Sequence, residues 1–528
     1  MKVMDYLQNH HDISIRLIFV EFREAKVATN KEWEKYFEQG NIAFEQGQYE
    51  QAETMLKAAL STSERGQDEL VTATSLDRLG ELYFEMQQYD QAEPLFKRAL
   101  GIRERLLKPH DDMVVASLNN LSALYFFQGK HDQAEAPCKK LCEVYEAVLG
   151  KDHAEVATSV NNLALIYSAQ GKNEEAQELF ARALAIKEKA LGRQHPEVGD
   201  ILNNMANICI SETRYEEAEP LLTEAIAILE TGIGSDHPDL IPILTSLAAV
   251  SQVNGNHKAA SKHLERLLSL KEINLAPNHP EVVDCIVNLA SSYLYEGRFA
   301  DAERLYKRAM GIRERAKGRQ SPEVAEIIAA IAFVHQSDNK YLLAENLYKE
   351  ALAICEQSRG ANSPEAEARL WDLACLYHNN ARYQKAEPLW QRLATLREEH
   401  LGENHPDTQA CLDSLIICYL QQTKYAEAEK LLVRLKNLRE ASLGPDHADV
   451  AACLHYLAEI MRHDGRFDQA EQYYKRALDI RTKALGPNHP EVAHSLEGYA
   501  LLLAATYREM EAEHMRVCAE AILKAASH

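Results

Sequence analysis

The sequence is poor in the residues that make flexible linkers, with 22 glycines and 16 prolines among 528 residues. This scarcity argues against long linkers and low-complexity tails. No run approaches the ~18 consecutive apolar residues of a membrane-spanning helix. Residues 1–22 contain only a short apolar run and no small-residue cleavage site, so no signal peptide is expected. We expect a soluble, cytoplasmic protein.

The ten cysteines lack the spacings of a metal site or a disulfide framework. None forms a Cys-x-x-Cys pair. Free thiols in this number indicate a reducing compartment. No phosphate-binding loop, nucleophile elbow or pair of catalytic carboxylates is visible either. The sequence therefore predicts no metal, no cofactor, no small-molecule substrate and no enzymatic activity.

Basic residues are outnumbered by acidic ones, 58 to 80, which gives a net charge of -22. A chain with this charge repels phosphate backbones and anionic lipid head groups, so neither nucleic acid nor a membrane is an expected partner. A protein or peptide partner with basic or neutral segments fits better. The alternative interpretation is that the charge only keeps the surface soluble.

What the sequence does contain is a repeat with a period of 42 residues and no inserted or deleted residue over eight intervals. Such regularity indicates a solenoid, in which each unit buries its apolar face against its neighbours. The marker is a phrase resembling His-Pro-Glu-Val, which begins at His153, His195, His237, His279, Ser321, Ser363, His405, His447 and His489.

Each unit reads as an antiparallel helical hairpin. In the unit from His195 to Gly234, apolar residues follow helical spacing on both sides of a polar break at residues 211–214. Gly234 is placed to end the second helix in a left-handed conformation. The position before the proline is histidine in most repeats, serine at Ser321 and Ser363, and aspartate at the apparently equivalent Asp111. These residues share the ability to accept hydrogen bonds at a helix start, so we expect caps and not catalytic groups.

Small and aromatic residues recur at fixed places, as in Leu163-Ala164-x-x-Tyr167 followed by Ala176-x-x-x-Phe180. This order is the tetratricopeptide pattern. It predicts that Trp390 belongs to the core. The fold class is therefore all-α, a right-handed superhelical solenoid of about twelve antiparallel helical hairpins. Residues 1–30 form an N-terminal segment of unclear structure, residues 31–68 a first, shorter hairpin, and residues 69–528 the regular array.

The long unit resembles the repeats of kinesin light chains. The likeness is carried by Asn161-Asn162-Leu163-Ala164-Leu165-Ile166-Tyr167, by Gln170-Gly171-Lys172, and by the Leu-Gly-x-x-His-Pro joint. The resemblance implies a protein-binding array whose asparagines contact the backbone of a bound peptide, which falls best on Asn120, Asn162 and Asn204. A long heptad coiled coil, which those proteins also carry, is not seen before Glu32.

Two neighbouring positions of the first helix predict a peptide-binding groove. Asparagine offers both a donor and an acceptor, so a ladder of them can hold a peptide main chain. With helices ~10 Å apart and a peptide rise of ~3.3 Å, one rung meets about every third residue. The alternative is that each asparagine only joins neighbouring helices. The candidates are Asn119, Asn120, Asn161, Asn162, Asn203, Asn204 and Asn288.

The second half of the array places different side chains at these two positions, which would make the groove more aromatic and acidic there. Trp371 is the hot-spot candidate, with contact to a neighbouring helix as the alternative. Asp372, His455 and Tyr456 complete the predicted set. The preferred hypothesis is a non-catalytic scaffold or adaptor that holds an extended partner segment. The alternatives are a kinesin light chain-like motor-cargo adaptor and a self-assembling structural rod.

Overall fold

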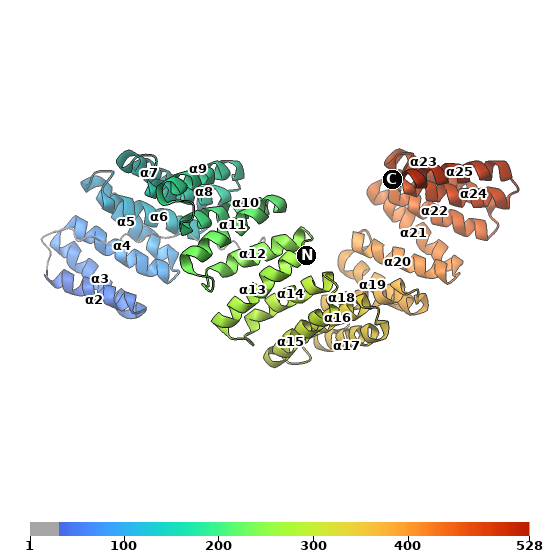
Figure 1. Ribbon diagram of the computed structural model, residues 1–528, viewed down its shortest axis with the longest axis horizontal. Coiled ribbons are helices and arrows are strands. Elements are labelled where there is room, and N and C mark those ends of the chain that lie inside the picture. Colours follow the sequence, from blue (N-terminus) through green and yellow to red (C-terminus); the bar gives the residue numbers. More distant parts are fainter. Residues whose placement is uncertain (1–30, 527–528) are drawn as a thin grey trace. The chain divides into compact units, whose positions relative to one another are not determined.

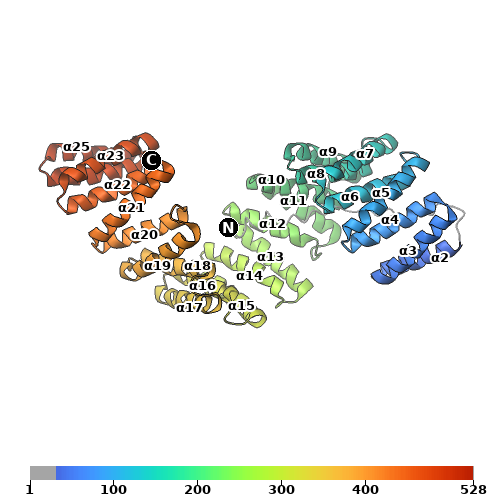
Figure 2. The same cartoon turned by 180° about the vertical axis from the view of Figure 1, so that it is seen from behind.

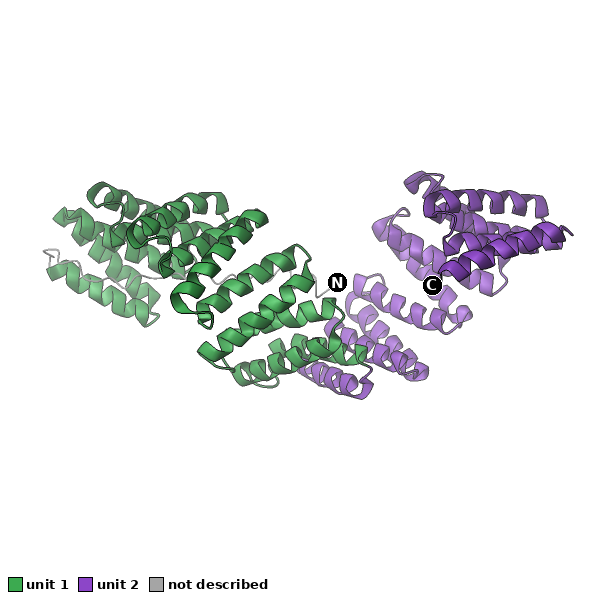
Figure 3. Cartoon of the chain, turned by 45° about the horizontal axis from the view of Figure 1, so that its top comes forward, with its two compact units in different colours: residues 1–296 green, residues 297–528 purple. Residues whose placement is uncertain are grey.

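The computed structural model describes residues 31–526, and the predicted N-terminal segment 1–30 lies outside them. Within the described residues the chain forms twenty-four α-helices and no strand. They fall into two compact units, which meet in the sequence between Glu296 and Gly297 (Figure 3). The array boundary predicted at residue 68 stays a prediction.

The described part of unit 1, residues 31–296, consists of six helical hairpins followed by two more helical segments (Figure 1). Each helix packs against the next in sequence. The hairpins are α2 (Lys31–Glu45) with α3 (Tyr49–Gly66), α4 (Glu69–Glu85) with α5 (Tyr89–Leu106), α6 (Asp112–Phe127) with α7 (His131–Leu149), α8 (Ala154–Ala169) with α9 (Asn173–Leu191), α10 (Pro196–Ser211) with α11 (Tyr215–Ile233), and α12 (Leu240–Val253) with α13 (His257–Leu275). The 3-10 helix η1 (Pro280–Val282) and α14 (Val283–Tyr295) follow.

Unit 2 begins with α15 (Phe299–Lys317) and continues with five hairpins (Figure 2). Consecutive helices again pack against each other. The hairpins are α16 (Pro322–Ser337) with α17 (Tyr341–Arg359), α18 (Pro364–Asn379) with α19 (Tyr383–Leu401), α20 (Pro406–Gln421) with α21 (Tyr425–Leu443), α22 (Ala448–His463) with α23 (Phe467–Leu485), and α24 (Pro490–Ala505) with α25 (Glu509–Ala526). The predicted all-α array of helical hairpins is confirmed.

The repeated histidines cap helices, as the sequence predicts. The Nδ1 atom of His153 accepts a hydrogen bond from the backbone N–H of Glu155 at 3.2 Å, and His489 accepts one from Glu491 at the same distance. Ser321 does the same through its hydroxyl oxygen, 3.3 Å from the N–H of Val324. Each cap satisfies a donor that the helix geometry leaves free.

From α7 to α23, the second helix of each hairpin is followed by a residue in a backbone conformation that favours glycine. Gly234, for example, has φ 93° and ψ 154° directly after α11. Ala276 occupies the same place after α13 and adopts φ 78° and ψ 149°. This region of backbone space is nearly exclusive to glycine, so the alanine is strained.

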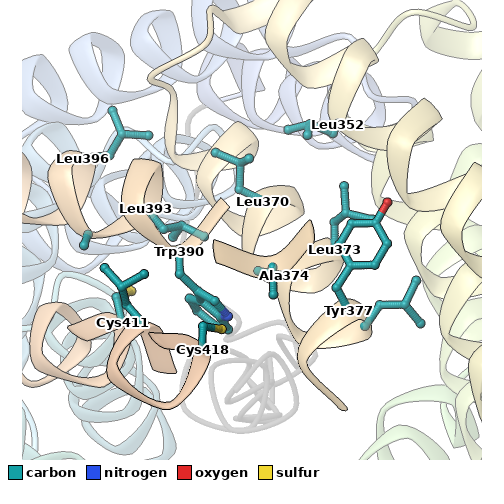
Figure 4. Close-up of a cluster of buried hydrophobic side chains, with 14 of the residues drawn as sticks. Leu352, Leu370, Leu373, Ala374, Tyr377, Trp390, Leu393, Leu396, Cys411 and Cys418 are labelled. Carbon is teal, nitrogen blue, oxygen red and sulfur yellow. The ribbon is translucent and has the colours of Figure 1, made fainter. Parts of the chain in front are cut away.

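Trp390 belongs to the core, as predicted. Its side chain is 1% exposed and lies among the buried side chains of α18, α19 and α20, including Leu370, Ala374 and Cys418 (Figure 4). Small residues let these helices approach while the aromatic ring fills the space between them.

All ten cysteines are free thiols.

Polar contacts also link successive repeats. Glu345 on α17 accepts hydrogen bonds from Tyr377 at 2.8 Å, Arg382 at 2.8 Å, and Lys349 at 2.7 Å. Burial acts to raise the pKa of Glu345, but the bonds from Lys349, Tyr377 and Lys385 hold it at about 2. The same kind of carboxylate recurs at Glu135.

No helix among residues 31–526 has the length and apolarity to cross a bilayer.

Candidate functional site

The predicted asparagines lie on the first helices of unit 1, but their side chains divide into two groups. Asn119 on α6, Asn162 on α8 and Asn203 on α10 are half-buried. Within the described residues, none of these three side chains has a hydrogen-bond partner. We call this set of three the asparagine face. Each of three successive first helices thus offers one carboxamide with an unused donor and an unused acceptor.

The neighbouring asparagines serve the stack. Asn120 is 7% exposed and donates to the Glu81 carboxylate at 3.3 Å. Asn204 is 5% exposed and donates to the carboxamide oxygen of Asn161 at 3.2 Å. These bonds join consecutive first helices, which is the scaffolding role weighed as the alternative. Asn288 on α14 is half-buried, and its backbone oxygen accepts from Gln252 at 3.3 Å.

A pocket opens between α6 and α8, and it brings Asn119 and Asn162 together. Val115 and Leu141 are among its apolar residues, and Tyr145 comes from α7. The full lining is Val115, Ala116, Asn119, Leu141, Tyr145, Glu155, Thr158, Ser159 and Asn162. The pocket therefore combines apolar walls with amide and hydroxyl groups and one carboxylate.

In unit 2, Trp371 contacts a neighbouring helix as well as solvent. Its ring meets the Trp390 ring edge-on at a centroid separation of 4.9 Å, and the Arg397 guanidinium lies 4.5 Å from the ring centroid. Asp372 is half-buried, 3.3 Å from the Nε atom of Arg369. Burial raises the pKa of the Asp372 carboxyl against the effect of Arg369. The alternative interpretation of Trp371, packing between helices, thus accounts for much of its surface.

His455 and Tyr456 differ in burial in the same way as the neighbouring asparagines Asn204 and Asn203. His455 is 1% exposed, and its ring packs against those of Tyr474 and His494. Among residues 31–526, neither ring nitrogen of His455 has a hydrogen-bond partner, and burial lowers the pKa of His455 to about 3. Its burial assigns it to packing. Tyr456 stays half-buried and lines a cleft with Arg481, Glu491 and His494.

Sequence reasoning missed several pocket residues. Tyr145, Glu155 and Thr158 line the pocket beside the asparagines, although none belongs to the two ladder positions. One signal was available. Tyr145 falls in a 42-residue series that reads Arg103, Tyr145 and Lys187, so an aromatic residue interrupts two basic ones.

Comparison with known proteins identifies the repeat. A family model described as tetratricopeptide repeat matches residues 35–105, 71–147, 113–189, 155–231, 197–273, 239–315, 323–399, 408–483 and 454–525. A search of curated proteins finds no match.

Several solved structures are similar to parts of the chain. BtubC (BKLC) from P. vanneervenii is 21% identical, with 43% of this chain and 91% of that chain covered and a TM-score of 0.38. The nearly identical repeats of a putative kinesin light chain from Podosopora anserina are 25% identical, with 40% and 98% covered and a TM-score of 0.35. The C-terminal part of a repeat protein from Cytophaga hutchinsonii is 16% identical, with 54% and 97% covered and a TM-score of 0.38.

Proposed function

Because the chain belongs to the tetratricopeptide repeat family, we propose that it is a non-catalytic scaffold that holds an extended segment of a partner protein. The asparagine face is the proposed binding surface. One observation carries the proposal: the carboxamides of Asn119, Asn162 and Asn203 have no side-chain partner among the described residues, although each is half-buried. Polar groups in such surroundings gain most from a ligand that matches both donor and acceptor.

A peptide backbone is such a ligand, since each residue other than proline presents one N–H and one carbonyl. A carboxamide can bond to both, which fixes the direction of an extended segment without selecting its sequence. The net charge of -22 favours a basic or neutral segment over an acidic one. The free thiols support a role in the cytoplasm, where cysteines stay reduced.

The test compares two triple variants by affinity capture from native lysate. The first is Asn119→Ala, Asn162→Ala and Asn203→Ala. The matched control removes three exposed loop asparagines, Asn278→Ala, Asn362→Ala and Asn488→Ala. Both variants should melt like the wild type, because none of the six positions is buried.

We expect the control to retain each partner of the wild type and the first variant to lose at least one. A partner that both variants retain equally binds through another surface. If every partner behaves in that way, the asparagine face is not the binding site.

A further inference from the structure

The second and third residues of α17, Leu342 and Leu343, are large apolar side chains exposed to solvent. Their exposed fractions are 69% and 51%, and the preceding Tyr341 is 36% exposed. In each of the other second helices among residues 31–526, at least one of these two places holds a polar or charged residue, for example Asp132 in α7 and Asp468 in α23. The hairpin itself therefore does not require leucine at both places.

Three cationic side chains surround the carboxylate of Glu345, one turn further along α17. Lys349 and Arg382 pair with it at 2.7 Å and 2.8 Å, and Lys385 pairs with it at 3.1 Å. The three cationic side chains remain 51%, 40% and 53% exposed. Because one carboxylate balances a single positive charge, this surface keeps an excess of positive charge.

The corresponding surface around α7 has the opposite balance of charge. There Asp132 takes the place of Leu342, and Glu175 takes the place of Lys385. The remaining three positions keep one carboxylate and two cations, so acidic side chains outnumber basic ones. Around α17 the same five positions hold one carboxylate, three cations and a leucine.

The apolar and cationic groups share one face of α17. Leu342, Glu345 and Lys349 are separated by three and four residues, which places their side chains in one row. At a rise of ~1.5 Å per residue the row extends about 10 Å along the helix. Arg382 and Lys385 lie at the start of α19 and widen the surface. An apolar centre with a charged rim is typical of protein interfaces.

We call the exposed set Leu342, Leu343, Lys349, Arg382 and Lys385 the leucine surface. We propose that it binds an amphipathic α-helix of a partner protein, with the apolar stripe on the leucines and acidic side chains against the cations. A helix matches because its side chains repeat at the same three- and four-residue spacing as the row on α17. Its carboxylates compensate the local positive charge, although the chain as a whole is acidic. The leucine surface belongs to unit 2, so it is separate from the asparagine face of unit 1.

An anionic lipid surface also matches leucines beside cations. The net charge of -22 repels such a surface over its whole extent, whereas a short helix meets mainly the local cations. The partner helix is therefore the better match, and vesicle binding becomes one outcome of the test.

The test selects helices from a phage-displayed library against the intact chain. Library members carry an apolar stripe at three- and four-residue spacing, while each flanking position varies between glutamate, glutamine and lysine. The library is first depleted on the variant Leu342→Asp with Leu343→Gln, which removes helices that bind elsewhere. We expect wild-type protein then to enrich glutamate over lysine at the flanking positions. A selected peptide, labelled for fluorescence polarisation, measures the affinity of each variant.

The two variants of the leucine surface copy the pattern found around α7. Leu342→Asp with Leu343→Gln reproduces Asp132 and Gln133, and Lys385→Glu reproduces Glu175. Each should weaken the selected peptide about tenfold, and added salt should weaken its binding to wild type. Because the depletion uses the leucine variant, Lys385→Glu is the independent test.

Two control variants change exposed residues of α21. Leu443→Gln removes a leucine that is 47% exposed, and Lys430→Glu reverses an exposed lysine. Both should bind the selected peptide like wild type. The altered side chains in all four proteins are exposed, so their thermal unfolding should match that of wild type.

Failure to select a helix after depletion overturns the proposal. A selected helix flanked mainly by lysine, or one that Lys385→Glu binds as tightly as wild type, overturns it as well. Sedimentation with phosphatidylserine vesicles that only the leucine variant escapes would assign the surface to a membrane instead. The triple variant of the asparagine face should bind the selected helix like wild type, and loss of binding there would place the helix on unit 1 and overturn the proposal.

Discussion

The side-chain amide of Asn204 donates a hydrogen bond to the carboxamide oxygen of Asn161 at 3.2 Å, which joins α10 to α8. Its neighbour Asn203 makes no such bond within the described residues. Adjacent residues of a helix point about 100° apart, so one member of the pair faces the next helix while the other stays accessible. The two asparagines therefore have separable roles.

We predict that Asn204→Ala destabilises the protein by about 1–2 kcal/mol, because it removes a buried hydrogen bond. Asn203→Ala should change the free energy of unfolding by less than about 0.5 kcal/mol, as is usual for accessible positions. Urea unfolding of the two variants beside wild type measures both effects. Equal stability of the two variants would contradict the assignment of Asn204 to the stack.

Acid should weaken the contacts between repeats in a defined pH range. The pKa of Glu345 is held at about 2 in the folded chain, below its ordinary value of 4.5. A carboxylate whose pKa is lowered on folding contributes stability above its unfolded pKa, and this contribution is lost as pH falls through the folded pKa. We therefore predict a loss of stability between about pH 4.5 and pH 2.

Glu345→Gln tests this prediction. At pH 7 the variant should be less stable than wild type by about 1–3 kcal/mol, because it leaves the buried Tyr377 hydroxyl and its cationic neighbours without a charged acceptor. The difference should shrink as pH falls towards 2. Glu427→Gln, an exposed residue at the start of α21, is the control. Thermal unfolding across this pH range would refute the prediction if the two variants followed parallel curves.

Ala276→Gly should stabilise unit 1. Ala276 has φ 78° and ψ 149°, where a side chain costs of the order of 1–3 kcal/mol. Glycine removes this strain, but it also raises the conformational entropy of the unfolded chain, which lowers the free energy of unfolding by about 0.4–1 kcal/mol. The expected net gain is about 1 kcal/mol. The same substitution at the exposed helical residue Ala227 should destabilise by about 1 kcal/mol. Calorimetric melting that shifted both variants in the same direction would contradict the strain at Ala276.

The features that the sequence predicted best are those that depend on the period alone. His153 as a cap and Trp390 as a core residue follow from their places in the repeat, since every unit meets the same neighbours. Whether each predicted groove residue is buried or accessible does not follow from the period in this way. His455 is buried against Tyr474, His494 and Gly498, which lie 19 to 43 positions away, so its exposure depends on residues of other helices.

The pocket at Glu155 was hidden for a related reason. Its lining comes from α6, α7 and α8, so no single position of the repeat reveals it.

The last hairpin bears on the self-assembling rod. One position of the second helix carries a buried side chain in each of the other hairpins, for example Phe180 and Tyr474. At this position α25 has Arg516, whose side chain is 42% exposed and lies 3.2 Å from Glu513. Stacking another copy on this face would desolvate a charged group where the array elsewhere buries apolar surface, and such burial is costly.

We therefore predict that the wild-type mass, measured by light scattering, does not increase with concentration. Arg516→Tyr restores the aromatic residue found at Tyr474 and should promote association if this face can stack at all. Glu513→Gln, which removes the neighbouring charge without adding apolar surface, is the control. Concentration-dependent growth of the wild type would contradict the prediction and favour the rod, because it would show that Arg516 does not prevent stacking.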